Sequence, residues 1–331
     1  MMAPVTISGV AKCVPEKVVT NFDLESLVET SDEWISKRTG IKTRHVAVEE
    51  TATGMAVCAA RDALVMSGIP AGEIGIIVAC TITGDDLTPS LAGQVQKALD
   101  IPHCAAMDVS AGCTGFIYAL VSAASLMDTL HQDAAIVVAS ERMSRYTDWT
   151  DRSTCVLFGD GAGALVLRRS EIPHLLYPIL DATPDTDGVI VVKKEERETP
   201  FSGPVDEKRE YIRMKGADVF TYAVGVMENT LKQLAGQCGE QPYTKIVPHQ
   251  ANEKIIDFVV RSMHMSRDQF FVNIANYANT SSASIPIALC DAWESGWLDA
   301  GDRIALVGFG SGLTSGGAVI DWTIPNKNAT K

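Results

Sequence analysis

The sequence predicts an α/β fold built from two similar halves. Short apolar, β-branched runs alternate with helical patterns, which is typical of buried sheets covered by helices. Two glycine-rich turns that each run into an apolar strand begin at Phe158 and Phe309, roughly 150 residues apart. With 331 residues and 46% hydrophobic side chains, the chain is long enough for two domains or one large duplicated unit.

Hydrophobic periodicity predicts the secondary-structure elements in order along the chain. The predicted strands are residues 74–80, 107–110, 135–139, 245–247 and 303–307. The predicted helices are residues 53–67, 89–99, 114–130, 216–234, 252–263 and 281–294. Gly68 marks the end of the first helix and Pro89 the start of the second, because these residue types favour those positions.

The two glycine-rich turns indicate where each half of the chain closes. The first reads Phe158-Gly-Asp-Gly-Ala-Gly-Ala-Leu-Val-Leu, and the second reads Phe309-Gly-Ser-Gly-Leu-Thr-Ser-Gly-Gly-Ala-Val-Ile. Similar endings at this spacing fit an internal duplication, with an N-terminal half at residues 1–175 and a C-terminal half at residues 176–331. Chance similarity between two glycine-rich turns is the alternative.

Charge and composition argue against several classes of function. The formal net charge of −13 argues against nucleic acid as the main ligand, since that association needs a basic surface. The eight cysteines show neither a CxxC pair nor a cluster with histidine, so no zinc site is predicted. No apolar stretch reaches the ~18 residues of a membrane span, and the N-terminus lacks the pattern of a signal peptide. We therefore expect a cytoplasmic protein without a metal or a membrane partner.

The segment 193–213 lies between the two glycine-rich turns that close the halves. It is polar and charged and contains Pro200, Gly203 and Pro204. A solvated surface loop is the favoured interpretation. A lid over a neighbouring site is the alternative, because long loops often serve that purpose.

Cys113 is the first candidate for chemistry. It lies in Val109-Ser-Ala-Gly-Cys-Thr-Gly-Phe, where a short apolar strand ends and small residues lead into an apolar helix. A helix N-terminus favours thiolate, so we expect a lowered pKa and a nucleophilic sulfur. A buried cysteine is more often a packed hydrophobe, but the other seven cysteines lack such a turn.

His249 and Asn279 are two further candidates. His249 lies in Ile246-Val-Pro-His-Gln-Ala-Asn, directly after a predicted strand, where α/β folds place their ligand sites. Asn279 lies in Asn276-Tyr-Ala-Asn-Thr-Ser-Ser-Ala-Ser, a polar turn that leads into a helix. Taken singly, each has a common structural explanation, a hydrogen-bonded loop histidine and a helix-capping asparagine.

Together, a cysteine, a histidine and an asparagine allow two chemistries. In a papain-like protease the asparagine orients a histidine that deprotonates the cysteine, but that family is usually exported and carries its cysteine near the mature N-terminus in a different motif. In decarboxylative condensation, neutral histidine and asparagine side chains instead donate to the enolate that remains when a malonyl thioester loses CO₂. The position of Cys113 deep in the chain favours condensation.

Five motifs resemble those of the β-ketoacyl-acyl-carrier-protein synthase III family, and they span nearly the whole chain. Three contain the candidates above: Ala111-Gly-Cys-Thr-Gly-Phe, Val247-Pro-His-Gln-Ala-Asn and Asn279-Thr-Ser-Ser-Ala-Ser. The other two are Thr30-Ser-Asp-Glu-Trp-Ile-Ser-Lys-Arg-Thr-Gly-Ile and Phe158-Gly-Asp-Gly-Ala-Gly. Agreement across five motifs in order favours the functional interpretation of all three residues.

The resemblance implies a thiolase-like fold, two duplicated α/β halves in a five-layer arrangement, and a homodimer. It implies that Cys113 takes an acyl group from acyl-coenzyme A, while His249 and Asn279 stabilise the enolate of malonyl-acyl carrier protein. The products would be 3-oxoacyl-acyl carrier protein, CO₂ and coenzyme A, at the start of fatty acid synthesis. The backbone amides of Cys113 and Ser311 would bind the acyl oxyanion. Ser311 replaces a glycine of many relatives, which keeps the amide.

The resemblance also implies contacts with the two substrates, and no cofactor, since the coenzyme A thioester is itself a substrate. Trp34 and Arg152 match a pair that stacks on adenine, and Arg38 and Lys215 are further candidate coenzyme A contacts. Lys254 is the candidate contact for the acidic carrier protein. It replaces a common arginine, which keeps the charge but loses bidentate geometry.

Two positions that depart from the family pattern bear on the substrates. Ala217 stands where relatives often have an asparagine near the pantetheine arm, which puts one polar contact in doubt. In relatives that prefer short primers, an aromatic residue at the position of Thr88 projects across the dimer interface and closes the acyl pocket. The smaller threonine predicts room for primers longer than acetyl. Repacking by neighbours such as Leu87 is the alternative.

Three other functions compete with this interpretation. A degradative thiolase needs a second cysteine late in the chain, whereas residues 309–317 contain none. A synthase III-like enzyme of secondary metabolism, or one that joins long acyl chains, would share the catalytic trio. A catalytically silent acyl-binding protein should have lost a member of that trio, and none is missing. The natural primer and acceptor therefore stay open.

Overall fold

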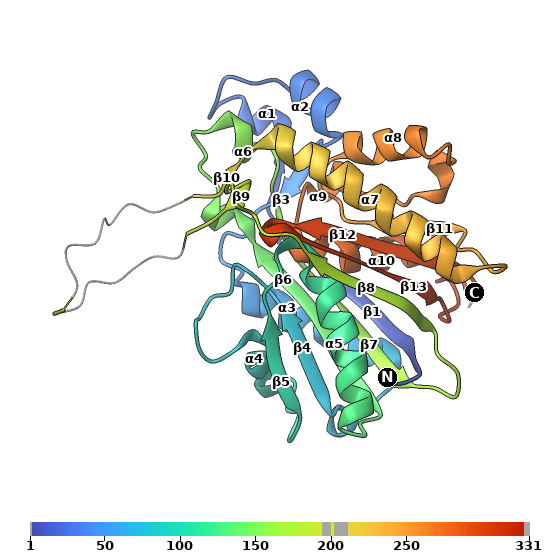
Figure 1. Ribbon diagram of the computed structural model, residues 1–331. Coiled ribbons are helices and arrows are strands. Elements are labelled where there is room, and N and C mark those ends of the chain that lie inside the picture. The colour runs from blue at the N-terminus through green and yellow to red at the C-terminus, as the bar shows by residue number, and fades with distance from the viewer. Residues whose placement is uncertain (1, 194–199, 202–210, 328–331) are drawn as a thin grey trace.

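Two sheets with the same strand order organise the chain (Figure 1). The computed structural model describes residues 2–193, 200–201 and 211–327. The first sheet has the order β1 (Val5–Cys13), β7 (Asp160–Arg169), β6 (Ala134–Arg142), β4 (Ile76–Cys80) and β5 (Ala105–Val109). The second has the order β8 (Leu175–Ala182), β13 (Thr314–Asp321), β12 (Arg303–Gly310) and β11 (Lys245–Pro248).

The strand directions match as well as the order. In the first sheet β4 is parallel to β6, and β7 is antiparallel to both β6 and β1. In the second, β11 is parallel to β12, and β13 is antiparallel to both β12 and β8. An isolated parallel bridge from Ile246 to Phe270 occupies the place that β5 has in the first sheet. The predicted duplication of an α/β unit is therefore confirmed.

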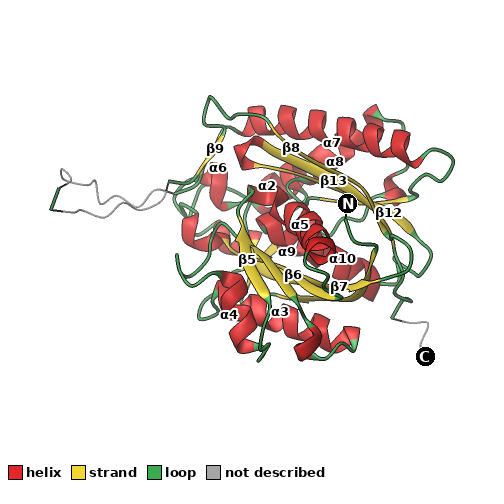
Figure 2. Ribbon diagram, turned by 60° about the horizontal axis from the view of Figure 1, so that its bottom comes forward, coloured by secondary structure: helices red, strands yellow, loops and turns green. Residues whose placement is uncertain are grey.

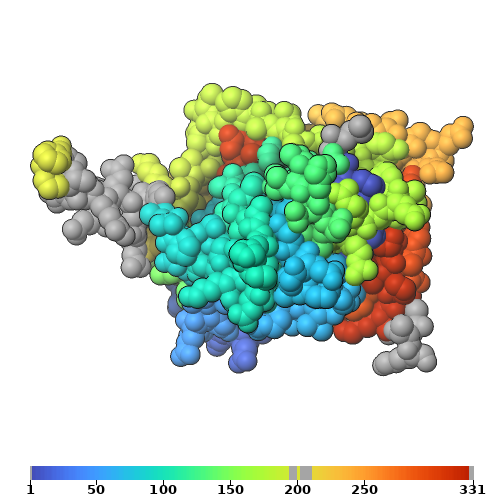
Figure 3. Space-filling view, turned by 90° about the horizontal axis from the view of Figure 1, so that it is seen from below, coloured from blue at the N-terminus to red at the C-terminus, as the bar shows by residue number. Residues whose placement is uncertain are grey.

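Helices form the remaining three layers (Figure 2). The outer face of the first sheet is covered by α3 (Ala52–Ser67) and α4 (Leu91–Ala98), and that of the second by α7 (Gly216–Cys238) and α8 (Glu253–Ser262). The layer between the sheets is formed by α5 (Gly115–Thr129) and α10 (Ser284–Glu294). Segments of the N-terminal half form most of the face seen from below, with C-terminal segments at its border (Figure 3). The predicted five-layer arrangement is confirmed.

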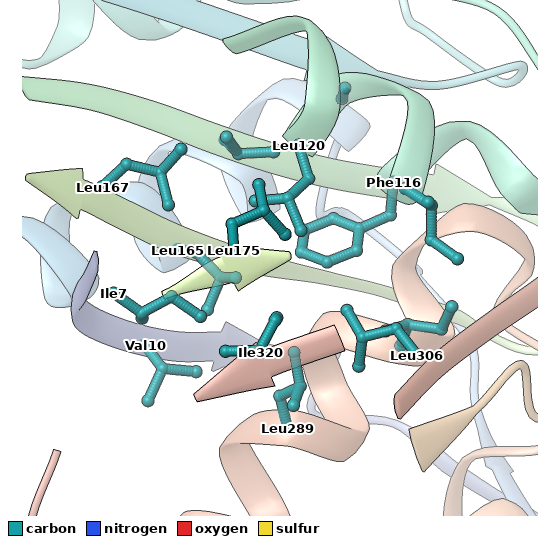
Figure 4. Close-up of a cluster of buried hydrophobic side chains, with 14 of the residues drawn as sticks. Ile7, Val10, Phe116, Leu120, Leu165, Leu167, Leu175, Leu289, Leu306 and Ile320 are labelled. Atoms are coloured by element: carbon teal, nitrogen blue, oxygen red, sulfur yellow. The ribbon is translucent and has the colours of Figure 1, made fainter. Parts of the chain in front are cut away.

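The central layer is held by apolar packing between the sheets (Figure 4). Phe116 and Leu120 of α5 are fully buried, as expected for a helix that is apolar all round. They belong to one cluster with side chains from both sheets and from α10, including Ile7, Val10, Leu165, Leu167, Leu175, Leu289, Leu306 and Ile320. Because burial of apolar area is the main stabilising term, this cluster fixes the two halves against each other.

Shorter elements connect the layers, and several gather at one end of the sheets. The helices and strands are β2 (Val18–Thr20), α1 (Asn21–Leu24), α2 (Asp32–Thr39), β3 (Thr43–His45), α6 (Arg152–Cys155), β9 (Ile190–Val191), β10 (Arg213–Met214) and α9 (Ile274–Tyr277). The 3₁₀ turns are Ala71–Glu73, Gly112–Thr114, Met143–Tyr146, Arg267–Gln269, Ser281–Ala283 and Ser311–Leu313. In Figure 1, α1, α2, α6, β9 and β10 lie together at this end.

The predicted elements are confirmed apart from their boundaries. At the predicted helix 281–294, α10 begins only at Ser284. Ser281 has a left-handed φ of 51°, and its backbone N–H donates to Asn279 Oδ1 at 2.8 Å. This side-chain turn competes with the helix, so Ser281 to Ala283 form a separate 3₁₀ turn.

Two expectations about the junction of the halves stay predictions. The strand β7 of the first sheet ends at Arg169, and β8 of the second begins at Leu175, so the proposed division after residue 175 falls just inside β8. Within the segment 193–213, residues 194–199 and 202–210 lie outside the described residues. The loop and lid interpretations therefore stay predictions, although Arg213 pairs with Val191 in a short ribbon of β9 and β10.

Candidate active site

A cavity of about 1110 Å³ opens where β4, β5, β6 and β11 end. This is the carboxyl edge of the parallel strands, where α/β folds bind ligands. Of the residues named from the sequence, its wall includes Cys113, His249, Asn279, Ser311, Trp34, Arg38, Arg152 and Leu87. Three others, Lys215, Lys254 and Thr88, are not among its lining residues.

Cys113 lies in the turn between β5 and α5, and this turn touches the second half of the chain. Gly112 has a left-handed φ of 54°, and a Cβ atom there would overlap Ser311. A Cβ atom on Gly310 would lie 2.6 Å from the backbone nitrogen of Cys113. Glycine at both positions therefore lets the backbones of Cys113 and Ser311 approach each other at the cavity floor.

The pKa of Cys113 differs from the sequence-based expectation. Burial raises the pKa of its thiol to about 11, and the carboxylate of Glu141 adds to the increase. A hydrogen bond with the Ser281 side chain and the thiol's own backbone N–H act in the opposite direction. The expectation of a lowered pKa was wrong, because removal of the sulfur from water outweighs the local donors.

His249 follows β11 and is held as a neutral imidazole. Burial lowers its pKa to about 3, and its ring packs edge-on against Phe309 with 5.1 Å between the ring centroids. Its Nδ1 lies 2.6 Å from Ser284 Oγ, which also accepts from the backbone N–H of Gln250 at 3.3 Å. Because the hydrogen bonds of the described residues offer the Ser284 proton no other acceptor, we assign that proton to Nδ1. His249 then carries its own hydrogen on Nε2.

Asn279 is oriented by its own backbone and by the turn that follows it. Its backbone N–H donates to the carbonyl of Leu157 at 2.9 Å, and its carbonyl accepts from Gly159 at 3.1 Å. Its Oδ1 accepts from the backbone N–H of Ser281. Since the oxygen of the amide is used in this way, the Nδ2 side is left to donate to a ligand.

The mouth of the cavity carries an aromatic ring with two cations close to it. The guanidinium carbons of Arg38 and Arg152 lie 4.5 and 4.8 Å from the ring centroid of Trp34. Arg152 also donates to the carbonyl of Glu29 at 2.9 Å, which ties the start of α6 to the loop before α2. A planar ring with adjacent cations suits a nucleotide with phosphate groups.

Comparison with known proteins identifies the family. The family model described as 3-oxoacyl-[acyl-carrier-protein (ACP)] synthase III matches residues 107–188, and its C-terminal counterpart matches residues 237–322. The β-ketoacyl-[acyl-carrier-protein] synthase III of Thioalkalivibrio sulfidiphilus is 44% identical and aligns with 95% of this chain and 98% of its own length. The chain belongs to the synthase III family.

Solved structures agree with this assignment. The 3-oxoacyl-[acyl-carrier-protein] synthase III of Aquifex aeolicus VF5 has a TM-score of 0.88 and 39% identity, covering 96% of this chain and all of that one. The priming β-ketosynthase of the R1128 polyketide biosynthetic pathway has a TM-score of 0.90 and 31% identity, covering 98% of each chain. The thiolase-like fold implied by the sequence motifs is therefore confirmed.

Three of the synthase III candidates lie outside the cavity wall. Lys215 donates from Nζ to the carbonyl of Asp187 at 2.6 Å, just before α7. Lys254 is exposed on α8, and its Nζ lies 3.5 Å from Asp257 Oδ2. Thr88 and Leu87 are both exposed, with 74% of Leu87 accessible, although Leu87 also borders the cavity. A second copy of the chain would have to cover this loop for Thr88 to line an acyl pocket.

Sequence reasoning missed three residues that hold the synthase III trio in place. Ser284 contacts His249, Ser281 donates its backbone N–H to Asn279, and the fully buried Glu141 accepts from the hydroxyls of Ser281 and Ser282. The only sequence signal for Glu141 is its position at the end of a continuous apolar strand, which reads as a solvated strand end. No cluster of three or more His, Cys, Asp or Glu side chains suited to a metal is found within the described ranges. In the same ranges, no helix is long and apolar enough to cross a bilayer.

Proposed function

We propose that this chain catalyses decarboxylative Claisen condensation of an acyl group from acyl-coenzyme A with malonyl-acyl carrier protein. The products are 3-oxoacyl-acyl carrier protein, CO₂ and coenzyme A, and the reaction starts fatty acid synthesis. The observation that carries the proposal is the meeting of Cys113, His249 and Asn279 in one cavity. The names of the relatives at about 40% identity support the same activity.

In the first half-reaction, Cys113 attacks the thioester carbonyl of acyl-coenzyme A. The oxygen becomes negative in the tetrahedral intermediate, and the backbone N–H groups of Cys113 and Ser311 are proposed to bind it. Their close approach at Gly112 and Gly310 supports this assignment. Coenzyme A leaves, and the acyl group stays on the Cys113 sulfur.

In the second half-reaction, His249 and Asn279 are proposed to bind the thioester oxygen of the malonyl group. Loss of CO₂ places negative charge on this oxygen, and Nε2–H of His249 and Nδ2–H of Asn279 are suitable donors. A pKa of about 3 keeps His249 neutral over the physiological range. Because a neutral histidine does not attract the negative malonyl carboxylate, it does not oppose the conversion of that carboxylate into neutral CO₂. The enolate carbon then attacks the acyl group on Cys113.

The mouth is proposed to bind the nucleotide end of coenzyme A, with Trp34, Arg152 and Arg38 as its contacts. Their stacked arrangement at the cavity entrance supports this role. Lys215 lies one residue before the lining residue Gly216, so we propose it as a phosphate contact. Lys254, exposed on α8 near the lining residue Ile255, is proposed as a carrier-protein contact.

We further propose a cytoplasmic homodimer that needs no cofactor. The edge strand β5 exposes Met107, and the nearby cavity loop exposes Leu87. Unpaired strand edges and exposed apolar side chains of this kind are commonly covered in symmetric dimers. The partner subunit would then cover Thr88 and close the acyl end of the cavity, the part near Leu87 where the acyl group is expected to bind.

A second candidate function is priming in secondary metabolism. The 31% identical structure described as a polyketide priming β-ketosynthase favours it, because the two chains align over 98% of their lengths. Both candidates use the same trio and differ in primer and acceptor. Sequencing of neighbouring genes would not separate them as directly as turnover would.

The test is intact-protein mass spectrometry followed by turnover. Mixing with acyl-coenzyme A should add one acyl mass to the wild-type chain and none to Cys113→Ser, since a serine hydroxyl has no comparable nucleophilic anion near neutral pH. A panel of acyl-coenzyme A lengths with malonyl-carrier protein and malonyl-coenzyme A as acceptors then identifies the reaction. Acylation without any condensation product would contradict the proposed function.

A further inference from the structure

Glu141 is a fully buried carboxylate behind the wall of the cavity. It lies near the end of β6 and has no exposed surface. Its Oε2 accepts from Thr83 Oγ1 at 2.5 Å, from Thr81 Oγ1 at 3.3 Å and from the backbone N–H of Ile82 at 3.2 Å. These three donors follow β4 and line the cavity, whereas Glu141 is not among the lining residues. Glu141 can therefore act on the cavity only through its neighbours.

The other oxygen of Glu141 accepts from the second half of the chain. Ser282 Oγ donates to Oε1 at 2.5 Å, and Ser281 Oγ donates to it at 3.3 Å. Both serines lie in the 3₁₀ turn Ser281–Ala283 before α10. A Cβ atom on Gly115, at the start of α5, would lie 3.5 Å from Ser282 Cβ, so this turn packs closely against α5. One carboxylate thus links the turn after β4 to a turn of the C-terminal half.

Glu141 acts as an acceptor on both of its oxygens. Thr81 Oγ1 accepts from the backbone N–H of Thr83 at 3.0 Å, and Thr83 Oγ1 accepts from that of Arg142 at 2.7 Å. Since each threonine hydroxyl already accepts a hydrogen bond, its own proton is available to Glu141. Burial raises the pKa of the Glu141 carboxyl, and hydrogen bonds from both turns act against that increase. A carboxylate with several donors can stay ionised in the interior, and its charge strengthens each bond.

The turn at Ser281 orients the side-chain amide of Asn279. The backbone N–H of Ser281 donates to Asn279 Oδ1 at 2.8 Å, which leaves Nδ2 as the donor toward the cavity. Ser281 has a left-handed φ of 51° in this turn. Because that conformation is costly for residues other than glycine, the turn needs support from the surrounding fold. The bonds from Ser281 and Ser282 to Glu141 supply such support.

We propose that Glu141 is a positioning residue for the condensation half-reaction. By holding the turn at Ser281 and Ser282, it keeps Nδ2 of Asn279 directed at the thioester oxygen of the malonyl group. The inference rests on the proposed function, because it concerns a donor assigned to the enolate there. It adds a residue of the N-terminal half that controls the geometry of a donor in the C-terminal half.

Acylation of Cys113 should depend much less on Glu141. The proposed donors to the acyl oxyanion are the backbone N–H groups of Cys113 and Ser311, which approach each other at the cavity floor. Within the part of the chain that the structure describes, the hydrogen bonds of Glu141 go to other residues. A general loss of stability would impair both half-reactions, whereas a misdirected Asn279 amide would impair condensation alone.

Glu141→Gln is the first variant, because it keeps the size of the side chain and removes its charge. The backbone N–H of Ile82 can only donate, so the oxygen of the new amide must face the turn after β4. The amide nitrogen then faces Ser281 and Ser282, whose hydroxyls can no longer donate to that position. The maximal rate of condensation should fall by roughly tenfold, less than the ~10² lost when an oxyanion donor is removed outright. The KM for malonyl-carrier protein should change little.

A pair of variants at Ser281 tests the route through the turn. Ser281→Ala and Ser281→Gly both remove the hydroxyl, but only glycine adopts the left-handed φ without support. Condensation should therefore be slower in Ser281→Ala than in Ser281→Gly. The double variant Glu141→Gln/Ser281→Gly should recover part of the condensation rate that Glu141→Gln loses, because its turn no longer depends on the carboxylate.

The experiment measures the two half-reactions separately by rapid quench and intact mass. Acetyl-coenzyme A is the primer, and the acetylated chain is then mixed with malonyl-carrier protein at several concentrations. Ser140→Ala is the matched control, because Ser140 is buried beside Glu141 on β6 and donates to the carbonyl of Ala52 at 2.6 Å, at the start of α3. It should lower the melting temperature and leave the rates of both half-reactions unchanged.

The positioning role of Glu141 would be overturned by a wild-type condensation rate in Glu141→Gln, or by equal losses of acylation and condensation. If Glu141→Gln does not fold, the pair at Ser281 decides, and equal condensation rates in Ser281→Ala and Ser281→Gly would reject the route through the turn. A wild-type chain that is acetylated but forms no condensation product would instead contradict the proposed function itself.

Discussion

The floor and the mouth of the cavity are built in different ways. At the floor, His249 and Asn279 are buried and held by hydrogen bonds to Ser284, Ser281 and backbone groups. At the mouth, Arg38 and Arg152 are exposed and contact the ring of Trp34. Preorganised donors stabilise charge that develops in a transition state, whereas exposed stacking contacts bind the substrate as it stands. Changes at the floor should therefore lower kcat, and changes at the mouth should raise KM.

The largest effect is expected at the floor. His249→Ala or Asn279→Ala should reduce condensation by roughly 10² to 10³, the usual loss for one oxyanion donor, while self-acylation of Cys113 is retained. Single-turnover mass spectrometry separates the two half-reactions. Ser284→Ala keeps the imidazole but removes the hydrogen bond that fixes its tautomer, so it should cause a smaller loss of condensation. An equal loss of acylation in His249→Ala would favour a protease-like pair of Cys113 and His249 instead.

A smaller effect is expected at the mouth. Trp34→Ala should raise the KM for acyl-coenzyme A by about fivefold, because a partly exposed stack with a cation contributes on the order of 1 kcal/mol. The kcat at saturating substrate should change little. Arg261→Ala, an exposed arginine of α8 outside the cavity wall, is the control and should leave KM unchanged. A kcat defect in Trp34→Ala would remove the distinction between floor and mouth.

The acyl end of the cavity should respond to the size of residue 88. Thr88→Phe should depress turnover of longer primers while sparing acetyl-coenzyme A, by about fourfold for each excluded methylene at ~0.8 kcal/mol. The measurement is kcat/KM across acyl lengths, made on the dimeric protein. A wild-type chain that uses only acetyl-coenzyme A, or an unchanged profile in the variant, would contradict the pocket argument.

The smallest effect is expected on the carrier-protein face. Lys254→Glu should raise the KM for malonyl-carrier protein and reduce its dependence on salt, since exposed charges act mainly through screened attraction. Lys232→Glu on α7 is a matched control, because Lys232 is also exposed and paired with an acidic residue on its own helix. Identical salt profiles for wild type and Lys254→Glu would exclude this face from carrier binding.

Local patterns predicted the trio and the repeated strands, but not the groups that support the trio. Cys113, His249 and Asn279 each lie in a short motif that can be recognised without knowledge of the fold. The hydrogen bonds of Glu141 reach Thr83 and Ser282, 58 and 141 positions away in sequence, so only the folded chain shows them.

The same reason explains the wrong expectation for the pKa of Cys113. A helix N-terminus is visible in the sequence, and it favours thiolate. The burial and the Glu141 charge that raise the pKa come from segments that the fold brings to the turn. In the same way, the left-handed Ser281 delays the start of α10, and no periodicity in residues 281–294 signals it.

The close contact of Gly112 with Ser311 affects how the active site assembles and how its activity is lost. Each half of the chain supplies one side of this contact, and the nucleophile Cys113 lies at it. Neither half synthesised alone could assemble a working centre, even if its own sheet folded. On heating, activity should be lost when the two sheets separate, before the helical circular dichroism signal has decreased substantially. Turnover is therefore a sensitive measure of docking between the halves. Separate fragments that regain turnover when they are mixed would have re-formed the contact between Gly112 and Ser311.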